Sequence, residues 1–338
     1  MPLDPLPPLP GPRGPLSEHL LAALVASPHP LGAPPPVEDD PLGGEDLHLA
    51  LYCCYELHYR GFAGVDDRWE WEPSLLAFRA ALEAAFEAGL AAAVPRPPAP
   101  AGPGSMDLAL RALVDADEAP QLSRFLELRA DEDQLREWLV QRSANLLKEA
   151  DPYAFTIPRL TGAPKAAMVE ILADEYGGGR PERIHSRLFA EELSAVGLRA
   201  EYGAYLDRIP AAMLATVNLE SLLGLHRRWR AAAAGHLAVT EMTSAIPNRR
   251  YANALRRLGH ADATAYHDEH VVADAIHESI AAVDLAGGLA RQDPVLGVDA
   301  LWGAACLIEL EGRFASRTID AWEAGTSALL APLDRVAA

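Results

Sequence analysis

The feature that most restricts the possible folds is the helical spacing of apolar residues throughout the chain beyond residue 106. Apolar side chains recur every three or four positions, and Pro- or Gly-containing breaks separate the segments. Long runs of Val, Ile, Thr and aromatic residues are missing, as is any alternation of strands with helices. We therefore predict an all-α fold, with helices over residues 107–114, 119–129, 131–150, 163–176, 181–196, 200–207, 210–243, 248–258, 261–287 and 294–325.

The first third of the chain is divided by proline and glycine. Residues 1–16 and 29–44 are rich in both and are expected to be irregular, with helices at 17–26, 46–60 and 73–93. The following stretch, VPRPPAPAGPGS, excludes helix and has the composition of a linker. The chain is thus predicted to have four parts: an N-terminal segment (1–44), a helical extension (45–94), a linker (95–105) and a main domain (106–338).

Charge and cysteine content exclude several classes of protein. A formal net charge of −19 disfavours nucleic acid or an anionic membrane as partner, because phosphates attract basic surfaces. The start of the chain lacks the charged and apolar regions of a signal peptide, and no apolar run reaches the length of about 18 residues that spans a bilayer. The three cysteines form neither a disulfide framework nor a CxxC zinc motif. We expect a cytoplasmic protein.

The segment YHDEHVVADAIHESIA contains the most informative group of polar residues. His270, Asp274 and His277 have the spacing i, i+4, i+7, which places them on one stripe of a helix. The same stripe carries Ala273 and Ala281, so it is expected to face inward. Such side chains are costly to bury unless they are paired or bind a metal. The alternative is a solvated polar face.

Glu175 and His185 form a second candidate pair. On an unbroken helix, ten residues advance about 15 Å and rotate away from the first face. The two side chains therefore share a metal only if the helix breaks between them, and Gly177–Gly179 with Pro181 provide that break. The alternative is an ordinary helix end followed by a surface turn.

Two further glutamates are candidates. Glu241 lies three and four positions after Ala238 and Leu237, on a small apolar face where a carboxylate requires a partner. It could instead cap a neighbouring helix. Glu149 precedes an Asp-Pro pair that is expected to end a helix, and the pattern around it does not mark it as a ligand. Together, the candidates have the ligand types of helical di-iron or di-manganese carboxylate sites, and such imidazole and carboxylate sets suit Fe, Mn or Zn.

The chain resembles the haem-oxygenase-like di-iron oxidases over roughly residues 120–330. The resemblance rests on E-x9-H (Glu175, His185), the lone helical Glu241, H-x3-D-x2-H (His270, Asp274, His277), and the flanking DEYGGG and HSRLF. It implies a haem-oxygenase-like bundle of about seven helices, to which residues 45–93 add an extension. Within that extension, Glu56 and His58 are two positions apart, face different sides, and are not assigned as ligands.

The same resemblance implies a ligand set and an activity. The metal ligands would be Glu149, Glu175, His185, Glu241, His270, Asp274 and His277, with Glu175 as an additional carboxylate found in part of the family. The cofactors would be two Fe(II) ions, with Mn as the alternative metal, and O2 would be the co-substrate. The substrate would be a small organic molecule such as an amino-acid derivative or a fatty acid, undergoing N-oxygenation, C–C cleavage or desaturation. A homodimer is compatible with this reading.

Two other functions compete with the di-iron oxidase. His267 and Asp268 form an HD dipeptide, as in the helical HD-type metal-dependent phosphohydrolases, although no basic phosphate-binding motif accompanies it. With Glu269, these two residues are otherwise expected to form a solvated polar face. The second competitor is a non-catalytic helical binding protein whose His/Asp stripe is inert, and stoichiometric bound metal would exclude it.

Overall fold

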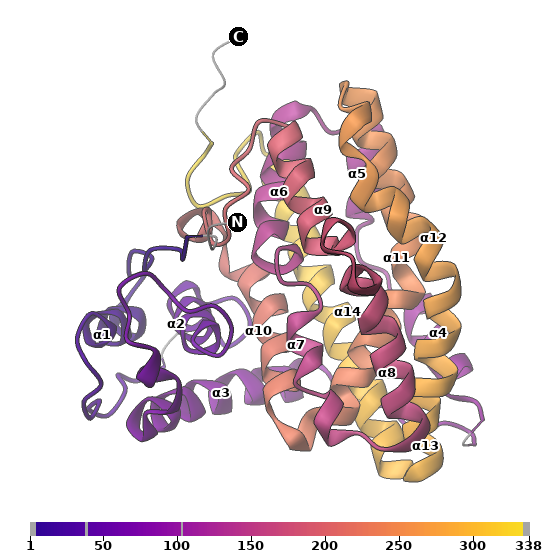
Figure 1. Cartoon of the computed structure of the whole chain (residues 1–338), viewed down its shortest axis with the longest axis horizontal. Helices are drawn as coiled ribbons and strands as arrows, with labels where there is room; N and C mark the ends of the chain where they lie inside the picture. The colour runs from indigo at the N-terminus through magenta and orange to yellow at the C-terminus, as the bar shows by residue number, and fades with distance from the viewer. Residues whose placement is uncertain (1–4, 38–39, 103, 334–338) are drawn as a thin grey trace.

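The prediction of an all-α fold is confirmed. The computed structural model describes residues 5–37, 40–102 and 104–333, except the side chains of residues 274–276, and within those ranges it contains helices and turns but no strand (Figure 1). The elements are α1 (Pro15–Leu24), α2 (Glu45–Glu56), α3 (Pro73–Ala93), α4 (Met106–Asp115), α5 (Leu122–Leu128), α6 (Glu132–Leu146), α7 (Asp151–Ala154), α8 (Gly162–Glu175), α9 (His185–Ala195), α10 (Ala211–Leu225), α11 (Arg230–Leu258), α12 (Ala265–Ser279), the π-helical segment η8 (Ile280–Ala286), α13 (Gly287–Gln292) and α14 (Pro294–Glu323).

The long helices α11 and α14 form the centre of a bundle, and α11 also packs along α12. Two glycines allow the close approach of α11 and α14. A Cβ atom on Gly235 would overlap the carbonyl oxygen of Ala300, and one on Gly303 would overlap that of Ala232. The two backbones therefore touch where these helices cross. This contact holds the α11 segment that carries Glu241 at a defined depth in the bundle.

Adding a methyl group at this crossing is expected to destabilise the protein. Gly235→Ala should lower the free energy of unfolding by about 2–3 kcal/mol, because overpacking forces two backbones apart. Gly312→Ala, in the partner helix α14, is the control, because the added Cβ would meet a side-chain atom, the Cβ of Ala119 at 3.1 Å, and no backbone atom. Urea unfolding followed by circular dichroism measures both. Equal midpoints for Gly235→Ala and the wild type would contradict the close crossing.

The helix predicted over 210–243 is in fact two helices. α10 ends at Leu225, His226 is extended, and α11 begins at Arg230. Arg159 donates hydrogen bonds to the carbonyl oxygens of Gly224 and Leu225, and so satisfies the end of α10 from outside. Arg159 precedes Gly224 by 65 positions in the chain, so the residues near the end of α10 give no sign of this contact.

Three other predicted helices differ from the structure in their extent or in their form. α11 continues through Pro247, where a break between 243 and 248 was expected. The packing of α11 against both α12 and α14 outweighs the hydrogen bond that the proline removes. The helix expected over 261–287 changes to π-helix at Ile280, and residues 200–207 form turns with only a short 3-10 segment.

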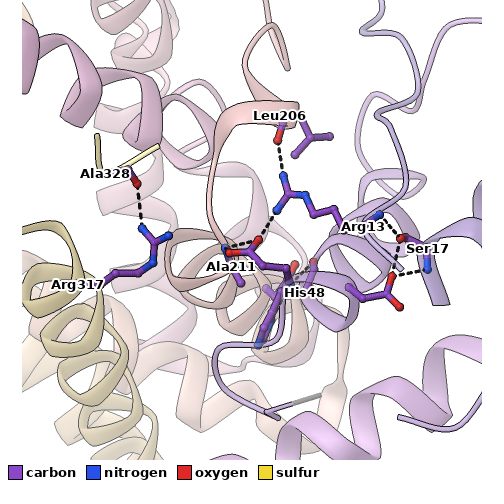
Figure 2. Close-up of polar contacts among 10 residues, drawn as sticks. Arg13, Ser17, His48, Leu206, Ala211, Arg317 and Ala328 are labelled. Carbon is purple, nitrogen blue, oxygen red and sulfur yellow. Dashed lines mark hydrogen bonds and ion pairs between the residues drawn. The ribbon is translucent and has the colours of Figure 1, made fainter. Parts of the chain in front are cut away.

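The N-terminal helices α1, α2 and α3 lie together on one side of the bundle, and α10 lies between them and the rest (Figure 1). Figure 2 shows polar contacts that fasten them. Arg13 donates to the Leu206 carbonyl and to Glu45, each at 2.7 Å, and Glu45 accepts the backbone N–H of Ala211 at 3.0 Å. In addition, Asn218 of α10 donates to the carbonyl of His48 in α2 at 2.9 Å. The extension is thus held to the bundle by hydrogen bonds.

One hydrophobic core runs from the N-terminal helices into the bundle, and a second surrounds α8, η8 and α13. The described linker residues, 95–102 and 104–105, are free of helix, as predicted, but Arg96 pairs with Asp299 of α14. The four-part division of the chain remains a prediction. Among the helices of the described ranges, none combines the length and apolar character needed to cross a bilayer.

Candidate metal centre

The structure brings six of the seven predicted ligands together in two groups. In each group, one nitrogen or oxygen atom per residue lies within 4.8 Å of those of the others. The four-residue group is Glu149, Glu175, His185 and His270, and the three-residue group is Glu175, Glu241 and His277. Glu175 belongs to both, so the groups are adjacent. The seventh candidate, Asp274, lies in α12 between the two histidines, and its side chain is outside the described part of the structure.

These residues come from five parts of the chain. Glu149 lies in the turn between α6 and α7, Glu175 is the last residue of α8, and His185 is the first of α9. Glu241 lies within α11, and α12 carries His270 and His277. Glu149 was expected to end a helix at the Asp-Pro pair, but that pair instead begins α7, where proline is tolerated.

The predicted break after Glu175 is present and brings Glu175 to His185. Gly177, Gly178 and Gly179 have φ values of +72°, +59° and +78°, which end α8 and reverse the chain. Glu175 Oε2 and His185 Nδ1 then lie 2.8 Å apart. The geometry of this contact is not that of a hydrogen bond, although the two groups form an ion pair when the imidazole is protonated.

His270 is oriented by its own helix. Its Nδ1–H donates to the backbone carbonyl of Tyr266 at 2.9 Å, and this leaves Nε2 facing Glu149 Oε1 at 3.5 Å. The tautomer follows from this hydrogen bond. The hydroxyl of Tyr266 donates to the same Glu149 oxygen at 2.6 Å. Tyr266 therefore orients both an imidazole and a carboxylate.

His277 has the opposite orientation. Its Nε2–H donates to Asp174 Oδ2 at 3.0 Å, and Nδ1 lies 3.4 Å from Glu241 Oε2. A carboxylate behind the imidazole is the usual arrangement for a metal-binding histidine. Asp174 and Tyr266 were not identified from the sequence. The signal for Tyr266 was its position four residues before His270 on the same helical stripe, whereas Asp174 had no signal.

The chemistry of the donor atoms fits divalent metal ions. Four atoms of these groups are buried without a hydrogen-bond partner in the described structure: Glu149 Oε2, Glu175 Oε2, His185 Nδ1 and His277 Nδ1. Buried carboxylate and imidazole atoms that lack hydrogen bonds are costly unless a proton or a metal ion binds them. Carboxylate with imidazole is a donor set that iron, manganese and zinc accept.

Electrostatic interactions within the groups point the same way. Burial alone would lower the pKa of His277, but the carboxylates of Glu241 and Asp174 outweigh it and raise that pKa to about 9. Burial likewise opposes ionisation of Glu149, yet His270 and His185 hold its pKa below the usual value. In the absence of metal, protons on the imidazoles thus balance the carboxylates, and a metal cation would replace those protons.

The prediction of a solvated face is wrong for His267. Its side chain is buried, donates to Asn248 Oδ1 at 2.7 Å, and lies 3.2 Å from Glu192 Oε1. Asp268 instead pairs with Arg256. Asn248 and Glu192 lie on other helices, and their hydrogen bonds allow the His267 side chain to be buried. The residues next to His267 in the sequence give no sign of these partners. The described residues place neither half of the HD dipeptide in a metal-binding group.

The turn that carries Glu149 is anchored by the N-terminal extension. Lys148, the preceding residue, donates to Glu56 Oε2 at 3.0 Å, and both side chains are buried. The hydroxyl of Tyr202 donates to the same oxygen at 2.6 Å. These two hydrogen bonds explain why Glu56 of α2, which the sequence analysis did not assign as a metal ligand, is buried. Its cationic partner was also missed, because the two lie 92 positions apart.

A cavity of about 310 Å³ adjoins both groups. Glu149, Glu175, Glu241 and His270 form part of its wall. Other polar lining residues include Arg142, Asn145, Glu220, Tyr251 and Glu311, none of which was predicted as a site residue. Leu146, Leu172, Leu237 and Leu307 add apolar surface. The volume suits a small organic molecule next to the metal-binding groups.

The chain is similar to the nitrosourea synthase of Streptomyces achromogenes subsp. streptozoticus, with 29% identity over 167 residues. The matched region is 49% of this chain but only 36% of the relative, so the chain corresponds to about a third of that protein. The model of a family described as iron-containing redox enzymes matches residues 136–312, just over half of the chain, and this range includes all seven candidate ligands. The chain therefore belongs to the family of iron-containing redox enzymes.

Proposed function

We propose that the protein is a non-haem di-iron oxidase or oxygenase that uses O2 to oxidise a small organic substrate. The observation that carries this proposal is the sharing of Glu175 between two adjacent groups of buried carboxylates and imidazoles. A carboxylate that belongs to both groups could serve two ions, and carboxylates with histidines from facing helices are the ligands of helical di-iron sites. Because the family consists of iron-containing enzymes, we propose iron as the bound metal.

Each group would hold one ion. Glu149, His185 and His270 would bind one, Glu241 and His277 the other, and Glu175 would contact both; Asp274 remains a proposed ligand from its position in α12. Bound Fe(II) supplies electrons and an open coordination position for O2.

The surrounding residues orient the ligands and the substrate. Tyr266 and Asp174 hold His270 and His277 in the tautomers that present a bare nitrogen to the metal. The cavity would hold the substrate beside the ions and exclude bulk water from them. The name of the nitrosourea synthase supports oxidation at nitrogen as the reaction type, in preference to C–C cleavage or desaturation. The bundle would be haem-oxygenase-like, with about seven helices after residue 120.

The experiment is anaerobic loading with Fe(II), measurement of bound iron, and mixing with O2. We expect two irons per chain, and Fe(II) oxidation faster than in buffer, because the carboxylate ligands favour the ferric state. Manganese loading with a phosphate ester tests the HD-type phosphohydrolase. Ester hydrolysis without any O2 consumption by the iron-loaded protein would overturn the oxidase. If the protein retained no metal at all, the non-catalytic binding protein would be the remaining function.

A further inference from the structure

Glu220 is a buried carboxylate that the proposed metal centre does not use. It lies in α10, its side chain lines the cavity, and it is 7% exposed. Its Oε1 accepts a hydrogen bond from Asn145 Nδ2 at 2.6 Å. Its Oε2 is buried and has no hydrogen-bond partner in the portion of the chain that the structure describes. A carboxylate oxygen in this position requires a partner that the protein does not supply.

Apart from the metal-binding groups and the exposed Asp117, the other charged residues at the cavity are already paired. Arg142 donates to both oxygens of Glu311, at 2.8 and 2.6 Å, so their charges cancel within the cavity wall. Lys148 is engaged by Glu56. Glu220 is therefore the one buried carboxylate of the described lining, outside the metal-binding groups, that has no cationic side chain bonded to it.

The metal centre does not supply the missing charge. Two divalent ions carry four positive charges, and the proposed ligand set contains four carboxylates: Glu149, Glu175, Glu241 and Asp274. A loaded centre is thus neutral as a whole. Burial, with Glu311 and Glu149 nearby, raises the pKa of Glu220 to about 8 despite Lys148. The empty cavity therefore disfavours the negative charge, which a bound cation would stabilise.

We propose that Glu220 is the subsite for a positively charged nitrogen of the substrate, an ammonium or guanidinium group, which donates a hydrogen bond to Oε2. The inference rests on the proposed function and selects among its substrates. It favours an amino-acid derivative or another cationic amine, and it disfavours a fatty acid, because Glu220 offers no positive charge to a substrate carboxylate.

The test compares three six-carbon probes that differ in charge: n-hexylammonium, 1-hexanol and hexanoate. Their binding to the anaerobic Fe(II)-loaded protein is measured by calorimetry. We expect n-hexylammonium to bind at least about tenfold more tightly than either of the others, because only the cation adds the attraction of opposite charges to its hydrogen bond with the carboxylate. Glu220→Gln should remove this preference while leaving 1-hexanol binding unchanged.

Asp117→Asn is the matched control. Asp117 also lines the cavity, but its side chain is exposed, so the same change of charge should alter n-hexylammonium binding less than about twofold. Glu220→Gln should fold, because the neutral carboxyl is already accommodated and the amide oxygen can still accept from Asn145.

The outcomes separate this subsite from the oxidase. Equal binding of n-hexylammonium and 1-hexanol, no binding of any probe at millimolar concentration, or an unchanged preference in Glu220→Gln would overturn the subsite. The iron content of the same samples tests the metal centre independently. Two irons with no cation preference would refute the subsite alone, whereas a Glu220-dependent preference without bound iron would refute only the oxidase.

Discussion

Replacing Glu175 with alanine is expected to weaken both metal positions at once. Glu175 belongs to both groups, and its side chain is only 7% exposed. Solvent therefore cannot easily replace the carboxylate that the substitution removes. Each position should lose at least about 10- to 100-fold in iron affinity, and bound iron should fall from two per chain to below one. Iron analysis after equilibrium dialysis measures the effect. Glu149→Ala and Glu241→Ala should each affect mainly one position.

Glu170→Ala is the control for this experiment. Glu170 lies on the exposed side of the same helix α8. Its substitution therefore measures the effect of replacing a glutamate in α8 without changing the metal-binding groups. It should retain two irons. Retention of one tightly bound iron by Glu175→Ala would show that the groups are independent and that Glu175 does not join them.

Gly177→Ala is expected to separate His185 from Glu175. A Cβ at Gly177 would lie 2.7 Å from the backbone carbon of Arg183 and 2.8 Å from the nitrogen of Ile184, so the segment leading into α9 has to move. The four-residue group should then lose at least about tenfold in iron affinity, because a displaced His185 would no longer reach the metal ion. The three-residue group does not include His185, so one iron per chain should remain. Iron titration measures both positions.

Gly179→Ala separates displacement from backbone strain. Both glycines have positive φ, +72° and +78°, so alanine costs about 1–2 kcal/mol of conformational energy at either position. At Gly179, however, no atom lies within 4 Å of the added Cβ. Gly179→Ala should therefore lower stability but retain more iron than Gly177→Ala. Equal iron loss in both variants would mean that the glycine turn acts through flexibility rather than through its contact with Arg183.

Much of the fold could be predicted from the sequence, because local periodicity and breakers act over one or two turns. The helix over 73–93 has the expected bounds, and the glycine break after Glu175 has the expected consequence. The boundaries that failed involve distant partners. Arg159 satisfies the end of α10, and packing carries α11 past Pro247. Neither effect is visible within a window of neighbouring residues.

For the site, the sequence by itself determined which carboxylates and histidines were available and that His270 and His277 share a helical stripe. The spacing of residues along a helix sets that stripe without reference to the rest of the chain. Only the tertiary structure decided that Glu175 joins two groups, that Asp174 and Tyr266 orient the imidazoles, and that Glu220 faces the cavity without a cation. Those properties depend on distances between side chains from different helices, and the close packing of those helices sets them.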